Sequence, residues 1–172
     1  MTRRDEGETY LPRLGKVRKS HPRVEAFGAV DELSCFVGLA RTAIKDQQID
    51  AVLKKIQESL FHVGSYLALE NHPLDRVGAI REELEEFAKR VESSLPLLTR
   101  FIYPSGVVGS SLLHVCRAVS RRAERAVVKL AEVEEVDPEV ISYLNYLSKF
   151  FFTLARHVNI SSGGSEEHWI SR

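Results

Sequence analysis

The stretch DPEVISYLNYLSKFFFTLARHVNI, residues 137–160, decides the fold class of this chain. Asp137 and Pro138 are the residue types that favour the N-cap and the first turn of an α-helix. The apolar residues that follow recur at three- and four-residue steps and so share one helical face: Val140, Leu144, Leu147, Phe151, Leu154 and Val158. A helix with one apolar face has to pack that face against other elements.

Four earlier segments show the same period, at about 20–40, 49–70, 76–95 and 110–134. In the first, the expected inward row is Val24, Phe27, Val30, Leu33, Val37 and Ala40. Alternation typical of a strand is absent, apart from an ambiguous run at 101–103. The sequence therefore predicts an all-α protein, a five-helix bundle of the ferritin-like up-down type. Residues 1–172 are expected to form one domain, with an N-terminal arm at 1–21 and a polar tail at 161–172.

Composition limits the function classes. The 24 basic and 24 acidic residues cancel, so any attraction for anions has to be local, and neither nucleic acid nor an acidic membrane is an expected partner. Runs of about 18 apolar residues are absent, so no membrane span is expected. Cys35 and Cys116 lie in apolar helical patterns, which predicts two buried free thiols in a reducing compartment. The acidic, charged N-terminus does not resemble a targeting peptide, and a cytoplasmic location is expected.

A row of arginines at 117–125, RAVSRRAER, interrupts the fourth apolar segment. At the helical period, Arg117, Arg121 and Glu124 share one face, whereas Arg122 and Arg125 fall on another. Surface ion pairs explain such a row if acidic neighbours surround it. The absence of lysine within the row favours planar, bidentate binding of an anion instead.

Two further regions do not fit a plain bundle. Asn145 lies in the middle of the last helix, where a poor helix former suggests a specific hydrogen bond, and it shares a face with Lys149, Phe152 and Arg156. The segment 97–109 is apolar but aperiodic, so it covers the core, a partner subunit or an apolar ligand.

Three motifs, taken together, resemble the PduO-type ATP:cob(I)alamin adenosyltransferases, a family of trimeric five-helix bundles. The first is KSHPRVEAFGAVDEL at 19–33, and the second is the arginine row at 117–125. The third is LNYLS at 144–148, followed by FFTLAR at 151–156. The order and spacing of all three motifs follow the family. The resemblance extends from residue 2 to about residue 159.

The resemblance implies an enzyme in which the cobalt of cob(I)alamin attacks the 5′ carbon of ATP and triphosphate leaves. The corrinoid supplies the reactive atom, and the protein supplies orientation and electrostatics. Fixed cations and Mg²⁺ would stabilise the charge on the leaving group. The resemblance further implies a homotrimer with sites at the subunit interfaces, a flavin-type reductase and an adenosylcobalamin-dependent enzyme as partners.

The nucleotide site that the resemblance implies extends from the N-terminal arm onto the helices: Thr2, Arg3, Arg4, Asp5, Gly7, Thr9, Lys19, Arg121, Arg122, Glu124 and Asn145. Either Arg121 or Arg122 would bind phosphate. Glu124 would also contribute to a Mg²⁺ site on the ATP phosphates.

The catalytic residues that the resemblance implies are Asp31, Arg117 and Phe101. Asp31 would pair with Arg117 across a subunit interface. Phe101 would lie under the corrin and displace the lower axial ligand of the cobalt. The corrinoid pocket would be completed by Val107, His114 and Trp169.

The chain departs from the family pattern at several positions near the nucleotide. Arg4 stands where the family's N-terminal loop has glycine, and His21 stands where it has aspartate before the proline. Tyr146 and Lys149 replace an arginine and an aspartate of the third motif. These changes bear on ATP and Mg²⁺ binding more than on the fold.

Two other functions stay open at this point. A diverged, non-catalytic module would hold or deliver a corrinoid without making adenosylcobalamin, in keeping with the altered N-terminal loop. A helical bundle that uses its arginines to bind nucleic acid is the third option, but the zero net charge and the interleaved acids argue against it.

Overall fold

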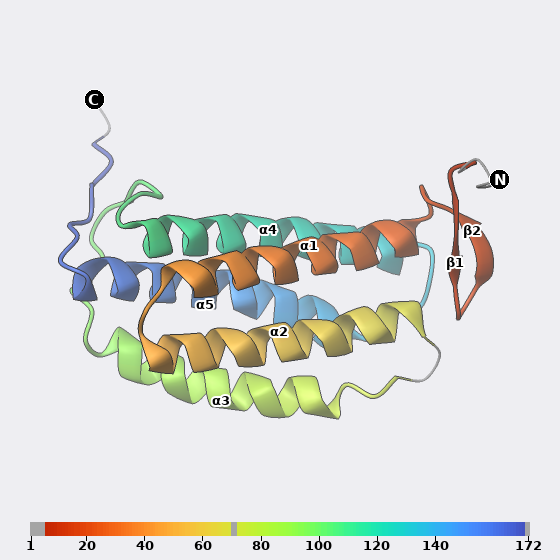
Figure 1. Ribbon diagram of the computed structural model, residues 1–172, viewed down its shortest axis with the longest axis horizontal. Helices are drawn as coiled ribbons and strands as arrows, with labels where there is room; N and C mark the ends of the chain where they lie inside the picture. Colours follow the sequence, from red (N-terminus) through yellow and green to blue (C-terminus); the bar gives the residue numbers. More distant parts are fainter. Residues whose placement is uncertain (1–5, 70–71, 171–172) are drawn as a thin grey trace.

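The computed structural model describes residues 6–69 and 72–170. Five antiparallel-running helices occupy most of it: α1 (Pro22–Ala43), α2 (Gln47–Ala68), α3 (Asp75–Glu92), α4 (Val108–Ala131) and α5 (Pro138–Ser161). Successive helices run in opposite directions along one long axis (Figure 1). The predicted up-down bundle of five helices is therefore confirmed, and Asp137 caps α5 as expected, because its side chain accepts from the Glu139 amide.

The all-α prediction was wrong in one respect, because the N-terminal arm contains a β-hairpin. Strands β1 (Glu8–Leu11) and β2 (Gly15–Arg18) pair antiparallel, with Thr9 opposite Val17. Gly15 has a φ of 74°, which suits glycine at the turn. With only four residues each, the strands are too short to show a clear alternation in the sequence. The ambiguous run at 101–103 forms one isolated bridge, Ile102 with His168.

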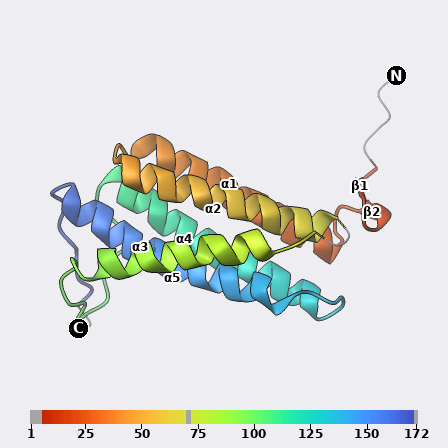
Figure 2. The ribbon, with the colours of Figure 1, turned by 90° about the horizontal axis from the view of Figure 1, so that it is seen from below.

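The helices pack so that α4 contacts both α1 and α5, while α2 contacts α1 and α3, and α3 also contacts α5 (Figure 2). Their shared core contains most of the apolar rows expected from the sequence, but in the first row Val24 is only partly buried and Phe27 lies outside the core. Phe27 is 37% exposed, because it faces the outer groove between α1 and α2.

Of the two cysteines that were predicted to be buried, Cys35 is exposed. Cys116 is buried as predicted, and burial raises its pKa to about 12.

Arg23 is a fully buried charge at the start of α1. Its exposed fraction is 0%, and its guanidinium donates to Glu134 at 2.6 and 2.9 Å and to the Leu67 carbonyl at 2.9 Å. Glu134 follows α4, and Leu67 lies near the end of α2. One side chain therefore ties three parts of the chain together at the end of the bundle that carries the hairpin.

Loss of the Arg23 guanidinium is expected to destabilise the fold. The substitution Arg23→Leu leaves the Glu134 carboxylate and a buried carbonyl without their partner, which should lower the free energy of unfolding by about 3 kcal/mol. The matched control is Arg76→Leu, because Arg76 pairs with Glu58 on the surface and its loss should lower the free energy of unfolding much less. Urea denaturation measures both, and equal effects of the two substitutions would contradict the assignment.

Candidate active site

The arginine row of α4 divides between two neighbouring helices. Arg122 forms an ion pair with Glu32 of α1. Arg117 and Arg121 instead line a groove beside α5, together with Ser148, Lys149, Phe152 and Thr153. The exposed Arg125 has no role in either group. The row therefore contains both of the arrangements considered for it. Arg122 forms a surface ion pair on one flank of α4, and Arg117 and Arg121 form an open cluster on the other.

We call the groove lined by Arg117, Arg121, Ser148, Lys149, Phe152 and Thr153 the cation groove. Its lining residues include three cations and no carboxylate. Arg117 Nε is buried and has no hydrogen-bond partner among the described residues. A buried donor without a partner is costly, so the groove is suited to an anionic ligand.

Glu124 and Asn145 meet in an adjoining hollow between α4 and α5. Asn145 Nδ2 donates to Glu124 Oε1 at 3.0 Å, which is the specific hydrogen bond expected of an asparagine inside a helix. The hollow has a volume of about 460 Å³ and is also lined by Arg81, Tyr146 and Lys149. This pair offers an amide and a carboxylate to a ligand that lies beside the cation groove.

Arg81 of α3 forms one wall of this hollow. Its guanidinium donates to Glu85 and Glu139 at 3.0 Å and to Ser142 at 2.9 Å. It also lies 5.4 Å from the centre of the Tyr146 ring, within the range of a cation–π interaction. Because its charge is already neutralised by two carboxylates, Arg81 shapes the wall rather than offering a free cation.

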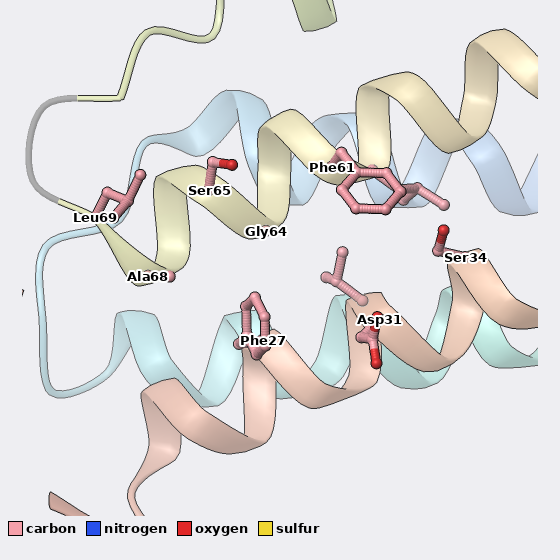
Figure 3. A pocket seen from close by; sticks show the side chains of 10 residues that line it. Phe27, Asp31, Ser34, Phe61, Gly64, Ser65, Ala68 and Leu69 are labelled. Atoms are coloured by element: carbon pink, nitrogen blue, oxygen red, sulfur yellow. The ribbon is translucent and has the colours of Figure 1, made fainter. Parts of the chain in front are cut away.

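Asp31 lies in a different groove, between α1 and α2 (Figure 3). Apolar residues dominate this groove, which is lined by Phe27, Asp31 and Ser34 of α1 and by Phe61, Ser65 and Leu69 at α2 and its C-terminal end. Asp31 is exposed there. Within one chain, Asp31 and Arg117 therefore line separate grooves, so a pair between them requires a second subunit.

Phe101 and Trp169 come together at the end of the bundle opposite the hairpin. Their rings pack edge to face with centroids 6.4 Å apart, and the Trp169 amide donates to the Phe101 carbonyl at 2.8 Å. Arg100 and Ile170 complete the lining of a hollow there. Phe101 is 79% exposed and Leu97 is 88% exposed, so this loop does not cover the core.

The C-terminal tail holds this aromatic pair in place. Arg156, which is buried on α5, donates to Glu166 at 2.6 and 3.2 Å and to the Pro96 carbonyl at 2.8 Å. The Tyr103 amide donates to the Glu167 carbonyl at 2.9 Å. Arg156 is therefore engaged with the tail, whereas Asn145, on the same helical face, binds Glu124.

Val107 and His114 lie deeper than Phe101 and do not line its hollow. The Val107 amide donates to Asn159 Oδ1 at 3.0 Å at the start of α4. His114 is buried beside Phe152, with ring centroids 6.1 Å apart, and its Nδ1 atom has no partner among the described residues. The structure therefore separates these two predicted corrinoid contacts from Phe101 and Trp169.

The N-terminal arm begins outside the described residues, where Thr2, Arg3, Arg4 and Asp5 lie. Of the rest, Gly7 has a φ of 76°, and Thr9 belongs to β1. The Lys19 amide donates to the Gly7 carbonyl at 2.8 Å, which closes the base of the hairpin. His21 replaces the expected aspartate without loss of the cap, because its Nδ1 accepts from the Arg23 amide at 3.2 Å.

Comparison with known proteins identifies the family. The family model described as cobalamin adenosyltransferase matches residues 1–158. A corrinoid adenosyltransferase of Bacillus subtilis is 40% identical over 167 residues, which cover 92% of this chain and 85% of that protein. The human corrinoid adenosyltransferase MMAB is 42% identical over 154 residues, which cover 83% of this chain and 61% of that protein.

Solved structures agree with the sequence relatives. A phenylalanine-to-alanine variant of a PduO-type ATP:corrinoid adenosyltransferase from Lactobacillus reuteri, complexed with cobalamin and ATP, superposes with a TM-score of 0.88 at 32% identity. The superposition covers 97% of this chain and 96% of the Lactobacillus reuteri chain. An arginine-to-lysine variant of that enzyme, complexed with ATP, also has a TM-score of 0.88. The chain belongs to the cobalamin adenosyltransferase family.

Several charged residues that shape the site or stabilise the bundle around it were not predicted from the sequence. Arg23 is in helical phase with Ala26, Val30 and Leu33, a signal that could have revealed its burial. Arg81 and Glu166 carried no such signal, because each depends on contacts between segments far apart in the sequence. No helix within 6–69 or 72–170 combines the length and apolarity that a membrane crossing needs.

His114 is expected to titrate below its ordinary range. Burial lowers its pKa, and the positive charge of Arg117 lowers it further. The unfolded chain then binds this proton more readily than the folded one, so His114 reduces the free energy of unfolding as pH falls below about 6.5. An NMR titration, with His114→Gln to assign the imidazole signal, measures the pKa, and a midpoint at or above 6.5 would contradict the expectation.

Proposed function

We infer that the chain transfers the 5′-deoxyadenosyl group of ATP to the cobalt of reduced cobalamin and releases triphosphate. Its family and its curated relatives are cobalamin or corrinoid adenosyltransferases, and a solved relative binds cobalamin and ATP together. The observation in this chain that carries the inference is the cation groove, which adjoins the Glu124–Asn145 pair. That juxtaposition provides one place for a nucleoside and one for its phosphates.

The polar residues of α4 and α5 divide the nucleotide between them in this proposal. Arg121 binds the phosphates, since Arg122 is already paired with Glu32. Glu124 and Asn145 bind the nucleoside end. The N-terminal residues Thr2, Arg3, Arg4, Asp5, Gly7 and Thr9, with Lys19, close over the phosphates. Their backbone amides suit an anion, because successive N–H groups in a tight loop form an anion-binding concavity.

Phe101 faces the corrinoid in this proposal. It is exposed, it packs against the only tryptophan of the chain, and its loop is held by the tail. A phenyl ring fills the axial space beneath a corrin without offering a donor atom, which favours loss of the lower ligand. Val107 and His114 are assigned no corrinoid contact in this proposal, because Val107 is bound to Asn159 and His114 packs against Phe152.

A homotrimer brings the separate parts of the site together. The groove between α1 and α2 carries apolar side chains and Asp31, and the cation groove carries the unpaired Arg117. Two different patches that complement each other form a head-to-tail contact, which closes into a ring when the rotation permits. Asp31 of one subunit then satisfies Arg117 of the next, and the nucleotide lies at their interface.

Mg²⁺ would enter with ATP rather than occupy a preformed site. The described residues contain no cluster of three or more metal-ligating side chains. Glu124 fits as a single carboxylate ligand, because Mg²⁺ is commonly held by one or two carboxylates together with substrate phosphates. There it would neutralise charge on the phosphates as triphosphate leaves.

The activity is tested with purified protein, ATP, Mg²⁺ and chemically reduced cobalamin. We expect an absorption spectrum of an alkylcobalamin and an equimolar release of inorganic triphosphate. Arg121→Ala should lower kcat/KM for ATP at least about 100-fold, because it removes a charged contact to the leaving group. The exposed Arg125→Ala is the matched control on the same helix and should change little. Corrinoid binding without conversion would instead identify the non-catalytic module.

The subunit contact is tested by reversing its charges. Asp31→Arg should weaken trimer formation, because it places like charges opposite each other, and a second substitution, Arg117→Asp, should restore part of it. Sedimentation velocity measures the oligomeric state, and activity is not the readout because Arg117 lies in the site. Glu82→Arg, on the exposed side of α3, is the control. A double variant no more associated than either single variant would remove the pair from the interface.

A further inference from the structure

Lys149 is the residue shared by the two halves of the candidate site. It lies on α5 one helical turn after Asn145, and it lines both the Glu124–Asn145 hollow and the cation groove. Its side chain is exposed. A lysine stem is long and flexible, so one ammonium group can follow a ligand that passes from the hollow into the groove.

Within the described residues Lys149 has no ion-pair or hydrogen-bond partner, although Glu124 lines the same hollow. Among the described ion pairs and side-chain hydrogen bonds, none involves Lys149, and Glu124 of the neighbouring hollow accepts from Asn145 instead. Glu92 accepts from Thr153 at 3.2 Å and does not line the cation groove. The positive charge of Lys149 therefore adds to those of Arg117 and Arg121 rather than being cancelled locally.

We propose that Lys149 binds the triphosphate part of ATP and so sets the affinity of this chain for polyphosphate. The proposal rests on the adenosyl-transfer function inferred above and assigns one further binding residue to it. If Arg117 pairs with Asp31 of a neighbouring subunit, Arg121 is the one arginine of α4 that is left to face the phosphates. Lys149 then supplies a further cation beside Arg121, at the junction between nucleoside and phosphate.

The same contact acts on substrate and product. Triphosphate carries the charge that Lys149 recognises both before transfer, as part of ATP, and after transfer, as the free leaving group. Lys149 therefore strengthens ATP binding and slows the release of triphosphate. Adenosine lacks the phosphates, so its binding is independent of Lys149.

The test is isothermal titration calorimetry of the full chain with three probes: ATP with Mg²⁺, inorganic triphosphate, and adenosine. Lys149→Gln should weaken ATP and triphosphate binding about 10-fold and leave adenosine binding unchanged, because one charged hydrogen bond is lost. Lys149→Arg keeps the charge and should bind within about 2-fold of the original chain. Lys45→Gln, in the loop between α1 and α2, is the matched control.

The outcomes distinguish the assignment of Lys149 from the adenosyl-transfer function on which it rests. Weaker binding of both phosphate probes by Lys149→Gln alone, with a smaller dependence on salt, supports the assignment. Equal binding by Lys149→Gln and the original chain overturns it and leaves the adenosyl-transfer function intact. A matching loss of adenosine affinity also overturns it, because Lys149 would then act on the nucleoside. An original chain that binds neither ATP nor triphosphate overturns the proposed function as well.

Discussion

The packing of α4 between α1 and α5 is the constraint on which the rest of the structure depends. Small residues such as Ser120 and Ala123 are buried along α4, so both neighbours approach it closely. The arginines between those residues cannot enter the core, because an unpaired buried charge is too costly. They are forced to the two flanks of the helix. One flank meets Glu32 of α1, and the other opens beside α5 as the cation groove.

That division gives the bundle two unlike surfaces. The α1/α2 groove is apolar and carries an exposed acid, whereas the α4/α5 surface is cationic and carries an arginine donor without a partner. Neither surface is complete by itself: the first leaves aromatic rings in water, and the second leaves charge uncompensated. Unlike surfaces of this kind support the proposed head-to-tail contact with a second copy, in which the site would draw its residues from both copies.

The long axis of the bundle separates the two ends of the site. The hairpin and the start of α1 lie at one end, and the segment that follows α5 lies at the other (Figure 1). The C-terminal tail stabilises the end of the bundle that carries Phe101 and Trp169. The buried Arg156–Glu166 ion pair fixes the tail, and Arg156 also donates to the Pro96 carbonyl in the loop that leads to Phe101. An exposed aromatic residue is thereby held on an otherwise irregular loop. The cation groove lies between the two ends, along α4 and α5.

The sequence by itself determined the helices and one hydrogen bond of the candidate site. Helical periodicity is a local property, so all five helices, the Asp137 cap and the hydrogen-bonded role of Asn145 could be predicted. Three motifs in order were enough to predict the family. Only the tertiary structure decided which arginine faces α1 and which faces α5, that Arg23 is buried, and that Phe101 meets Trp169. The physical reason is that those contacts join segments far apart in the chain, and no local pattern records which distant partner compensates a charge or covers a ring.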